Sequence, residues 1–537
     1  MVREQPASKL TLAVCCLALL LVAAPARVAM GDLSIEVAEA IEAGETERVR
    51  AAIQQHPRLA EGREGLWLLL SAAIHGRSEI AAMLIEHGAP VEGEGLPLSA
   101  AAAYGHDRVV SVLLEKGAQV NARSPRLETA LHGACRQGHA STAKLLLSAG
   151  ADVDVRDDHG LKPMHLAPSE EIEELLLAHG AQHDVFSAAR FGRLAIVRRL
   201  LSENSTIHSE RDQERHTPLH WAAMAGQTEV AELLLERGAS VRVRDSYGYT
   251  PLHQAAMDGS DNIVRLLLRE GAVINSESEN GVTPLYQAAL WGHDSTVKLL
   301  VAEGADVNAF EGVGVFPLFI AAARGHGDIA EFLIEKGAHV NARLPDGTTP
   351  LHAASSWGRK EVVRLVVKRG ADVEARDENG RRPMHFAAWE GNAEIMRILL
   401  ANGAQVSWPD AEGKTPLHYA AEVGDPGTVQ ALLQAGSEVD ATNGVGDTPL
   451  HAAARWEGSK AIPVLVKAGA NLNAKGRGGR TPLHMAADGL NEEAALLLLE
   501  AGADPNALDD RARTPRTECG NRRIAELLRR YGAEQSQ

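Results

Sequence analysis

Cysteine and aromatic residues are scarce in this sequence. Only four of its 537 residues are cysteine, and Phe, Trp and Tyr together make up 4%. No Cys-x-x-Cys pair and no His-Glu-x-x-His segment occurs, so the spacing that zinc sites use is absent. The Gly-x-Ser-x-Gly turn of serine hydrolases is absent as well. The sequence therefore predicts no metal site, no cofactor and no catalytic residue.

Basic charge is also in deficit. Lys and Arg number 54 against 71 Asp and Glu, and the resulting net charge of −17 is spread along the chain. Nucleic acids and anionic membranes both select for basic protein surface. We therefore expect neither of them to be a main partner.

A tetrapeptide that returns every 33 residues organises the chain. It reads Thr-Pro-Leu-His at 217–220 and ends with a worn copy, Thr-Pro-Arg-Thr, at 514–517. The copies between them start at Thr250, Thr283, Phe316, Thr349, Arg382, Thr415, Thr448 and Thr481. A fixed period of this size indicates one small supersecondary unit that is stacked many times.

Each unit carries the signals of two short helices. Thr217 suits a helix N-cap, because its hydroxyl can accept a hydrogen bond from a free backbone N–H, and Pro218 follows where a missing N–H costs nothing. Leu219 and the alanines after it recur at helical spacing. Gly226 and Gly238 are expected to end the first and the second helix. No single unit can bury its apolar face, so the units must stack.

The period and the tetrapeptide resemble those of the ankyrin-repeat family, and with weaker copies upstream the resemblance covers nearly all of the chain after residue 34. It implies an all-α solenoid of about 15–16 helix–turn–helix units with β-hairpin fingers between them. It also implies that the histidines at the last tetrapeptide position bridge the Thr hydroxyl and neighbouring backbone, which is a structural role. These histidines are His132, His165, His220, His253, His352, His385, His418, His451 and His484.

Residues 1–26 are predicted to be a secretory signal peptide. Arg3 and Lys9 precede an apolar run at 10–24, and Ala-Pro-Ala at 24–26 has the form of a cleavage site. The run is about 15 residues long, whereas a membrane span needs roughly 20. We therefore expect an exported protein, secreted or periplasmic, with an uncleaved N-terminal membrane anchor as the alternative.

The register of the repeats breaks once. The unit at 162–181 is shortened, because Pro168 cuts its first helix, and the next unit starts at His183 with no room for a finger. A polar stretch at 204–215 follows, and it begins with a glycosylation sequon at Asn204. We predict a degenerate N-terminal block at 32–203, a polar joint at 204–215, and a main block with a C-terminal cap at 216–537.

Two functions are compatible with a chain made of repeats. The favoured one is a non-catalytic scaffold or adaptor that presents an extended concave groove to a protein partner. The alternative is a secreted effector with an enzymatic or toxin-like activity grafted onto the repeats. Only the polar stretch at 204–215 could host such a graft.

Large aromatic residues fall at positions that face the groove in the family. These positions are the two residues before the glycine that ends a first helix, and they hold Trp291, Trp357 and Trp389. The energy of protein interfaces concentrates in Trp, Tyr and Arg, although a single tryptophan can equally pack between repeats. The predicted protein-binding residues are Tyr247 and Tyr249 on one finger, Trp408 on a later finger, and Trp291, Trp357 and Trp389 on the helices.

Overall fold

The computed structural model describes residues 32–310, 315–455, 458–517, 519 and 521–532. The predicted signal peptide at 1–26 lies outside these ranges. Within them the regular elements are helices, and no strand is formed. Most helices come in pairs joined by a tight turn.

The first helices of the pairs are α2 (Asp32–Ala43), α4 (Gly62–Ile74), α6 (Leu96–Ala103), α8 (Ala130–Gln137), α10 (Pro163–Leu166), α12 (Val185–Arg190), α14 (Pro218–Met224), α16 (Pro251–Asp258), α18 (Pro284–Trp291), α20 (Pro317–Arg324), α22 (Pro350–Ser356), α24 (Pro383–Trp389), α26 (Pro416–Val423), α28 (Pro449–Arg455) and α30 (Pro482–Asp488).

The second helices are α3 (Thr46–Gln55), α5 (Ser78–Glu86), α7 (Asp107–Glu115), α9 (Ala140–Ser148), α11 (Glu170–Ala178), α13 (Leu194–Glu203), α15 (Thr228–Glu236), α17 (Asp261–Arg269), α19 (Asp294–Ala302), α21 (Gly327–Glu335), α23 (Lys360–Lys368), α25 (Ala393–Ala401), α27 (Pro426–Gln434), α29 (Ile462–Lys467) and α31 (Glu492–Glu500). A last helix, α32 (Arg522–Arg530), follows them.

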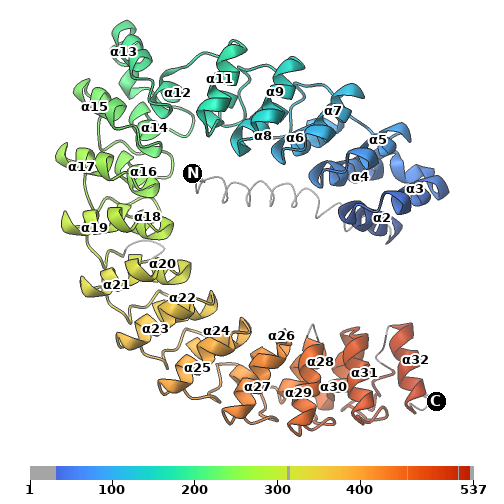
Figure 1. The fold of residues 1–537 in the computed structure, drawn as a ribbon. Helices are drawn as coiled ribbons and strands as arrows, with labels where there is room; N and C mark the ends of the chain where they lie inside the picture. The colour runs from blue at the N-terminus through green and yellow to red at the C-terminus, as the bar shows by residue number, and fades with distance from the viewer. Residues whose placement is uncertain (1–31, 311–314, 456–457, 518, 520, 533–537) are drawn as a thin grey trace. The chain divides into compact units, whose positions relative to one another are not determined.

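Fifteen helix pairs, from α2/α3 to α30/α31, therefore precede the single helix α32 (Figure 1). Consecutive first helices pack on one another, as α6 does on α8 and α26 on α28. The alanines predicted to line these contacts, such as Ala222 and Ala223, have no exposed surface. Small side chains let the helices approach closely, and the leucines between them exclude water. The all-α repeat solenoid expected from the sequence is confirmed.

Glycine ends many of the first helices in the left-handed conformation. Gly292, the C-cap of α18, has φ of 80°. A Cβ atom at this position would lie 2.6 Å from Cε1 of His326 in the next repeat, so both the backbone angle and the neighbour require glycine.

The fingers differ from the expected β-hairpins. In the finger at 245–249, Oδ1 of Asp245 accepts hydrogen bonds of 2.8 Å from the backbone N–H groups of both Tyr247 and Tyr249. The same side-chain turn recurs at Asp157, Asp377, Asp410, Asn443 and Asp509. One carboxylate or amide closes each of these fingers locally, so they are tight turns, and no strand is formed in the described residues.

The chain divides into two compact units. The first runs to Ala255 and includes residues 265–272, and the second comprises 256–264 and 273–537. The expected joint at 204–215 lies inside the first unit, where α12 packs on α14 and α13 packs on α15. The joint is ordered by a short 3-10 helix at Ile207–Ser209, and Oδ1 of Asn204 accepts from the N–H of Thr206. The boundary expected at 204–215 stays a prediction.

Candidate functional site

The repeated histidines form the caps of the first helices. In all nine tetrapeptides that end in histidine, Nδ1 of the histidine accepts a hydrogen bond of 3.0–3.2 Å from the backbone N–H of the first tetrapeptide residue. A backbone N–H can only donate, so the ring proton lies on Nε2. In seven of these rings Nε2 donates to a backbone carbonyl 29 residues further on, at 3.0–3.3 Å. Each of these seven rings therefore ties its helix to the next finger.

The threonine hydroxyl and the histidine ring cap the helix together. At Thr217 and most equivalent positions, the hydroxyl lies 2.8–2.9 Å from Nδ1 of the histidine, and the two side chains form a capping box with the helix backbone. The Thr349 hydroxyl accepts from the N–H of His352 at 3.4 Å. Thr283, whose tetrapeptide ends in Tyr286 instead of histidine, accepts from a helix N–H at 3.2 Å.

Burial keeps these imidazoles neutral. Loss of solvation lowers the pKa of His220, His352 and His385 to about 4. His352 and His385 are each 1% exposed. With both nitrogens bonded and the ring inaccessible to solvent, such a residue has no position from which to exchange protons with a ligand. This supports the structural role that the family resemblance implied.

The predicted binding residues are not equally accessible. Trp357 is 64% exposed, Tyr247 54%, and Trp389 and Trp408 46% each. Trp291 and Tyr249 are half-buried. The two tyrosines belong to the first compact unit and the four tryptophans to the second. We refer to Trp357, Trp389 and Trp408, which come from two successive repeats of the second unit, as the tryptophan face.

Trp408 lies over a buried cation. Arg382 stands where most repeats have threonine, and its guanidinium carbon is 5.1 Å from the centre of the Trp408 ring. Nε of Arg382 lies 2.8 Å from Oε2 of Glu374, and Nη1 donates to the carbonyl of Pro409 at 3.1 Å. Burial lowers the pKa of Arg382, and these partners hold its charge in place. The finger that carries Trp408 is thereby fixed to the helix cap beneath it.

Trp389 rests on a second aromatic residue. Its ring meets Tyr419 edge to face, with 5.7 Å between the ring centres. The Tyr419 hydroxyl donates to Oδ2 of Asp410 at 2.7 Å, and Nζ of Lys414 lies 5.7 Å from the Tyr419 ring centre. Burial and the bond to Asp410 raise the pKa of Tyr419. Trp389 is therefore held at a defined angle, with nearly half of its surface left to solvent.

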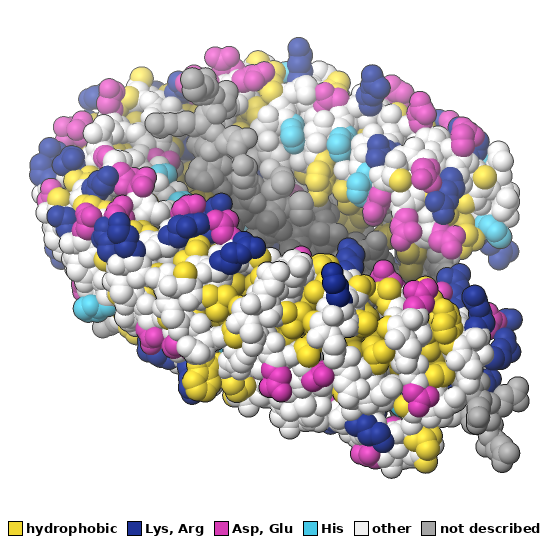
Figure 2. Space-filling view, turned by 60° about the horizontal axis from the view of Figure 1, so that its bottom comes forward, with side chains coloured by type: hydrophobic (Ala, Val, Ile, Leu, Met, Phe, Trp, Pro, Cys, Tyr) yellow, Lys and Arg dark blue, Asp and Glu magenta, His cyan; other side chains and the backbone are white. Residues whose placement is uncertain are grey.

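Trp357 is the most exposed of the three. It follows α22 as its C-cap, and its backbone N–H bonds to the carbonyl of Ala353 at 3.1 Å. Its counterparts one repeat before and after, Arg324 and Glu390, are also exposed. Figure 2 shows that hydrophobic side chains reach the surface of the C-terminal repeats among intermixed Lys, Arg, Asp and Glu side chains. Such a surface suits a protein partner of mixed character.

Trp291 and the two tyrosines are placed differently. Nε1 of Trp291 is buried and has no hydrogen-bond partner among the described residues, so this ring packs largely within the stack. Tyr249 contacts His253, with 5.4 Å between the ring centres, and its carbonyl accepts from Nε2 of His220. Tyr247 projects from the same finger, 6.5 Å from Tyr249 between ring centres.

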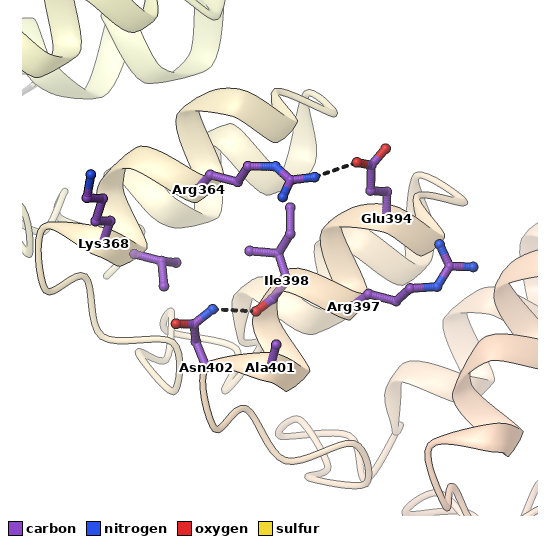
Figure 3. A pocket seen from close by; sticks show the side chains of 8 residues that line it. Arg364, Lys368, Glu394, Arg397, Ile398, Ala401 and Asn402 are labelled. Carbon is purple, nitrogen blue, oxygen red and sulfur yellow. Dashed lines mark hydrogen bonds and ion pairs between the residues drawn. The ribbon is translucent and has the colours of Figure 1, made fainter.

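A shallow hollow on the second helices has other properties. It lies between α23 and α25, holds about 640 Å³, and is lined by Arg364, Lys368, Arg397 and Ile398 among others (Figure 3). Arg364 donates to Glu394 across its edge at 2.6 Å. Exposed ion pairs of this kind contribute little to binding or stability. We therefore use this surface as a control below.

Metal-ligating clusters and long apolar helices are both missing from the described part of the chain. No group of three or more His, Cys, Asp or Glu side chains there is arranged to hold a metal ion. None of the helices there combines the length and the apolar character that a membrane crossing needs.

Comparison with known proteins gives the family. The sequence profile described as "Ankyrin repeats (3 copies)" matches residues 37–124, 98–187, 185–245, 238–311, 311–377, 374–443 and 420–509. The chain is 35% identical over 222 residues to ZDHHC13 of Danio rerio, which is named as a palmitoyltransferase, with 39% of this chain and 30% of that protein covered. It is 30% identical over 126 residues to human neurogenic locus notch homolog protein 1, with 21% of this chain and 5% of that protein covered.

A solved structure, the human ASB11 ankyrin repeat domain, matches with 29% identity and a TM-score of 0.39, over 42% of this chain and 99% of that domain. The chain spans less than a third of the length of the two curated relatives above, so their activities are not carried over to it. The profile, in contrast, matches almost the whole of the helical stack. This chain is therefore a member of the ankyrin-repeat family.

Proposed function

We propose that the protein is a non-catalytic scaffold or adaptor that holds a protein partner on the tryptophan face. The observation that carries the proposal is the exposure of three tryptophans, at 64%, 46% and 46%, on two successive repeats of one unit. An exposed indole gains the most from burial in an interface, and such residues dominate binding energies.

Preorganisation supports the same conclusion. Trp389 and Trp408 are held by Tyr419 and Arg382, so little side-chain entropy is lost when a partner covers them. The surrounding charges are balanced, because Asp377 pairs with Arg381 and Glu374 with Arg382. With the net charge of −17, this favours a partner of basic or mixed surface over nucleic acid.

The proposal is tested in two steps. The mature chain is immobilised, bound proteins are identified by mass spectrometry, and the candidate partner is purified and titrated calorimetrically. Trp357→Ala and Trp408→Ala should each weaken its binding by about 2 kcal/mol, as truncations at interface centres do. Arg397→Ala, on the hollow between α23 and α25, should leave the affinity unchanged.

The exposure of each residue separates binding from folding. Trp357 is 64% exposed, so its truncation should hardly change the thermal midpoint. Trp389→Ala also removes the contact with Tyr419 and should lower both affinity and stability. If Trp357→Ala and Trp408→Ala leave the affinity intact while Arg397→Ala reduces it, the partner binds the second helices and the proposal is wrong.

Export is a separate part of the proposal. The basic start, the short apolar run and the Ala-Pro-Ala at 24–26 support cleavage of a signal peptide and a secreted or periplasmic scaffold. Retention of residues 1–26 on a membrane-bound protein would instead support an N-terminal anchor.

A further inference from the structure

The repeat without a finger changes how its neighbours stack. Between α11 and α12 only residues 179–184 intervene, so the pair α12/α13 is not preceded by a finger. The finger before it therefore meets the finger after it directly, and Nδ1 of His159 lies 2.8 Å from Oε1 of Glu214. Glu214 also accepts from the Ser246 hydroxyl at 2.6 Å, which continues the row of fingers. The neighbouring fingers thus stay in contact with one another, although the helix pair α12/α13 has no finger before it.

The missing finger also removes the carbonyl that the cap histidine of α10 would bond. Nε2 of His165 instead lies 2.9 Å from Oδ2 of Asp184. Asp184 is the N-cap of α12, and its Oδ1 accepts from the N–H of Ser187 at 3.0 Å. Burial alone would raise the pKa of Asp184, but the bonds from His165 and Ser187 outweigh it and hold the pKa well below its usual value. This carboxylate is therefore fully used by its protein partners.

A cavity of about 430 Å³ lies where the missing finger would have packed. Its roof is formed by the two neighbouring fingers, and its floor by α10, α12 and α14. Its apolar wall consists of Leu161, Phe186, Leu200, Ile207 and Trp221. Cavities of this size and mixed character commonly hold a small organic ligand.

The Trp221 ring is held in this wall by several partners. Its Nε1 donates to Oδ2 of Asp212 at 2.9 Å, and the ring lies 5.7 Å from His165 and 6.1 Å from His216 between centres. His216 bridges two carboxylates, with 3.1 Å to Asp212 and 3.3 Å to Asp245. The second carboxylate of the cavity, Asp212, is therefore also satisfied within the protein.

Two arginines at the cavity remain without a carboxylate partner among the described residues. Arg156 donates to the neutral carbonyl of Gly160 at 2.7 Å, and no ion pair forms at Arg211 within the same ranges. Of the three acidic side chains on the lining, Asp184 and Asp212 are engaged by His165 and His216, and Glu210 is the third. A ligand carboxylate would give the two guanidinium groups the ion-pair partner that the protein does not supply.

We propose that this cavity binds a small amphiphilic carboxylate, with its hydrocarbon part against Trp221, Phe186 and Ile207 and its carboxylate at Arg156 and Arg211. The site lies in the first compact unit and is distinct from the tryptophan face of the second. A flexible-chain monocarboxylate fits both features, since its chain fills an irregular apolar wall and its head accepts from guanidinium groups.

Octanoate is a suitable probe, with octan-1-ol and octylammonium as controls of the same chain length. Calorimetric titration of the full chain should show saturable binding of octanoate. Octan-1-ol should bind at least fivefold more weakly, and octylammonium should not bind. Equal binding of the three would show that the arginines do not select the ligand, and would overturn the proposal.

Variants locate the site. Ile207→Trp, on the surface loop, should fill the cavity and weaken octanoate binding at least tenfold. Arg211→Glu should weaken it at least tenfold without changing the fold, because this side chain is exposed. Arg198→Glu makes the same charge change on the exposed face of α13, outside the cavity, and should have less than a twofold effect. Octanoate binding that is unaffected by Arg211→Glu would place the ligand elsewhere.

A quenching experiment gives an independent readout. A bromine at the end of the chain, as in 8-bromooctanoate, quenches a tryptophan that it contacts. The quenching should saturate in the wild-type chain and disappear in Trp221→Phe, which retains an aromatic ring. Quenching that persists in Trp221→Phe would contradict the assignment even if octanoate binds.

Discussion

The neutral cap histidines should make the stack sensitive to acid, and His352 offers the clearest test. Its ring is 1% exposed, Nδ1 accepts from the N–H of Thr349 at 3.1 Å, and Nε2 donates to the carbonyl of Arg381 at 3.2 Å. Loss of solvation lowers its pKa to about 4. In the unfolded chain an imidazole has a pKa of about 6.5.

The direction in which stability changes with pH follows from proton uptake by the unfolded chain. Between pH 6.5 and 4 the unfolded chain binds a proton at His352 and the folded chain does not, so stability is full above about 6.5 and falls as the pH drops toward 4. At pH 5 the difference between the two pKa values corresponds to a loss of about 2 kcal/mol at this one site.

Two substitutions separate titration from capping. His352→Ala leaves the Thr349 N–H and the Arg381 carbonyl without their partner, and it should lower the free energy of unfolding by about 2–4 kcal/mol at pH 7. His352→Gln can still accept from the Thr349 N–H and should cost less. Neither side chain titrates, so both variants should lose about 2 kcal/mol less than the wild-type chain between pH 7 and pH 5.

Urea unfolding followed by far-ultraviolet circular dichroism at the two pH values measures these differences. Repeat proteins can unfold in steps, so the transition that His352→Ala shifts is the one to compare. His339→Gln, at an exposed position of the same unit, is the matched control and should keep the wild-type pH dependence. If His352→Gln loses as much stability on acidification as the wild-type chain does, His352 is not a buried neutral base and the reasoning fails.

Three further outcomes are expected. Burial lowers the pKa of His216, but its bonds to two carboxylates outweigh this and raise it to about 9. The stability from this site should be full below about pH 6.5 and should decline by about 3 kcal/mol by pH 9. Proteolysis at 204–215 should speed up over the same pH range in the wild-type chain, and His216→Gln should remove this pH dependence. Leu490 has φ of 57°, so Leu490→Gly should raise the free energy of unfolding by about 1 kcal/mol, whereas Gly358→Ala, at φ of 64°, should lower it by a similar amount. N-terminal sequencing of the exported protein should start at Arg27, and a Met1 start would contradict signal cleavage.

The sequence predicts most of the fold because the local signals agree with one another. Threonine and proline start most first helices from α14 onward, glycine ends several of them in the left-handed conformation, and the leucine and alanine pattern selects the buried side. The finger turns are harder to predict from the sequence. Their conformation depends on whether the side chains of Asp245 and its equivalents bond to the backbone of their own turn or to solvent.

Contacts between distant residues explain the rest. The expectation of a polar joint at 204–215 follows from a stretch without an apolar period, but the bond between His159 and Glu214, 55 residues apart, depends on how the fingers stack. The sequence also does not reveal the support of Trp408 by Arg382. Its only sequence signal is arginine at a position where threonine is usual, which does not reveal that the side chain turns under a finger.

The most direct test of the proposed function is the affinity of the captured partner for Trp357→Ala, measured by calorimetry beside the wild-type chain and Arg397→Ala. A loss of about 2 kcal/mol in Trp357→Ala, with an unchanged thermal midpoint and an unchanged affinity of Arg397→Ala, is the result that the tryptophan face predicts. An affinity of Trp357→Ala equal to that of the wild-type chain would contradict it.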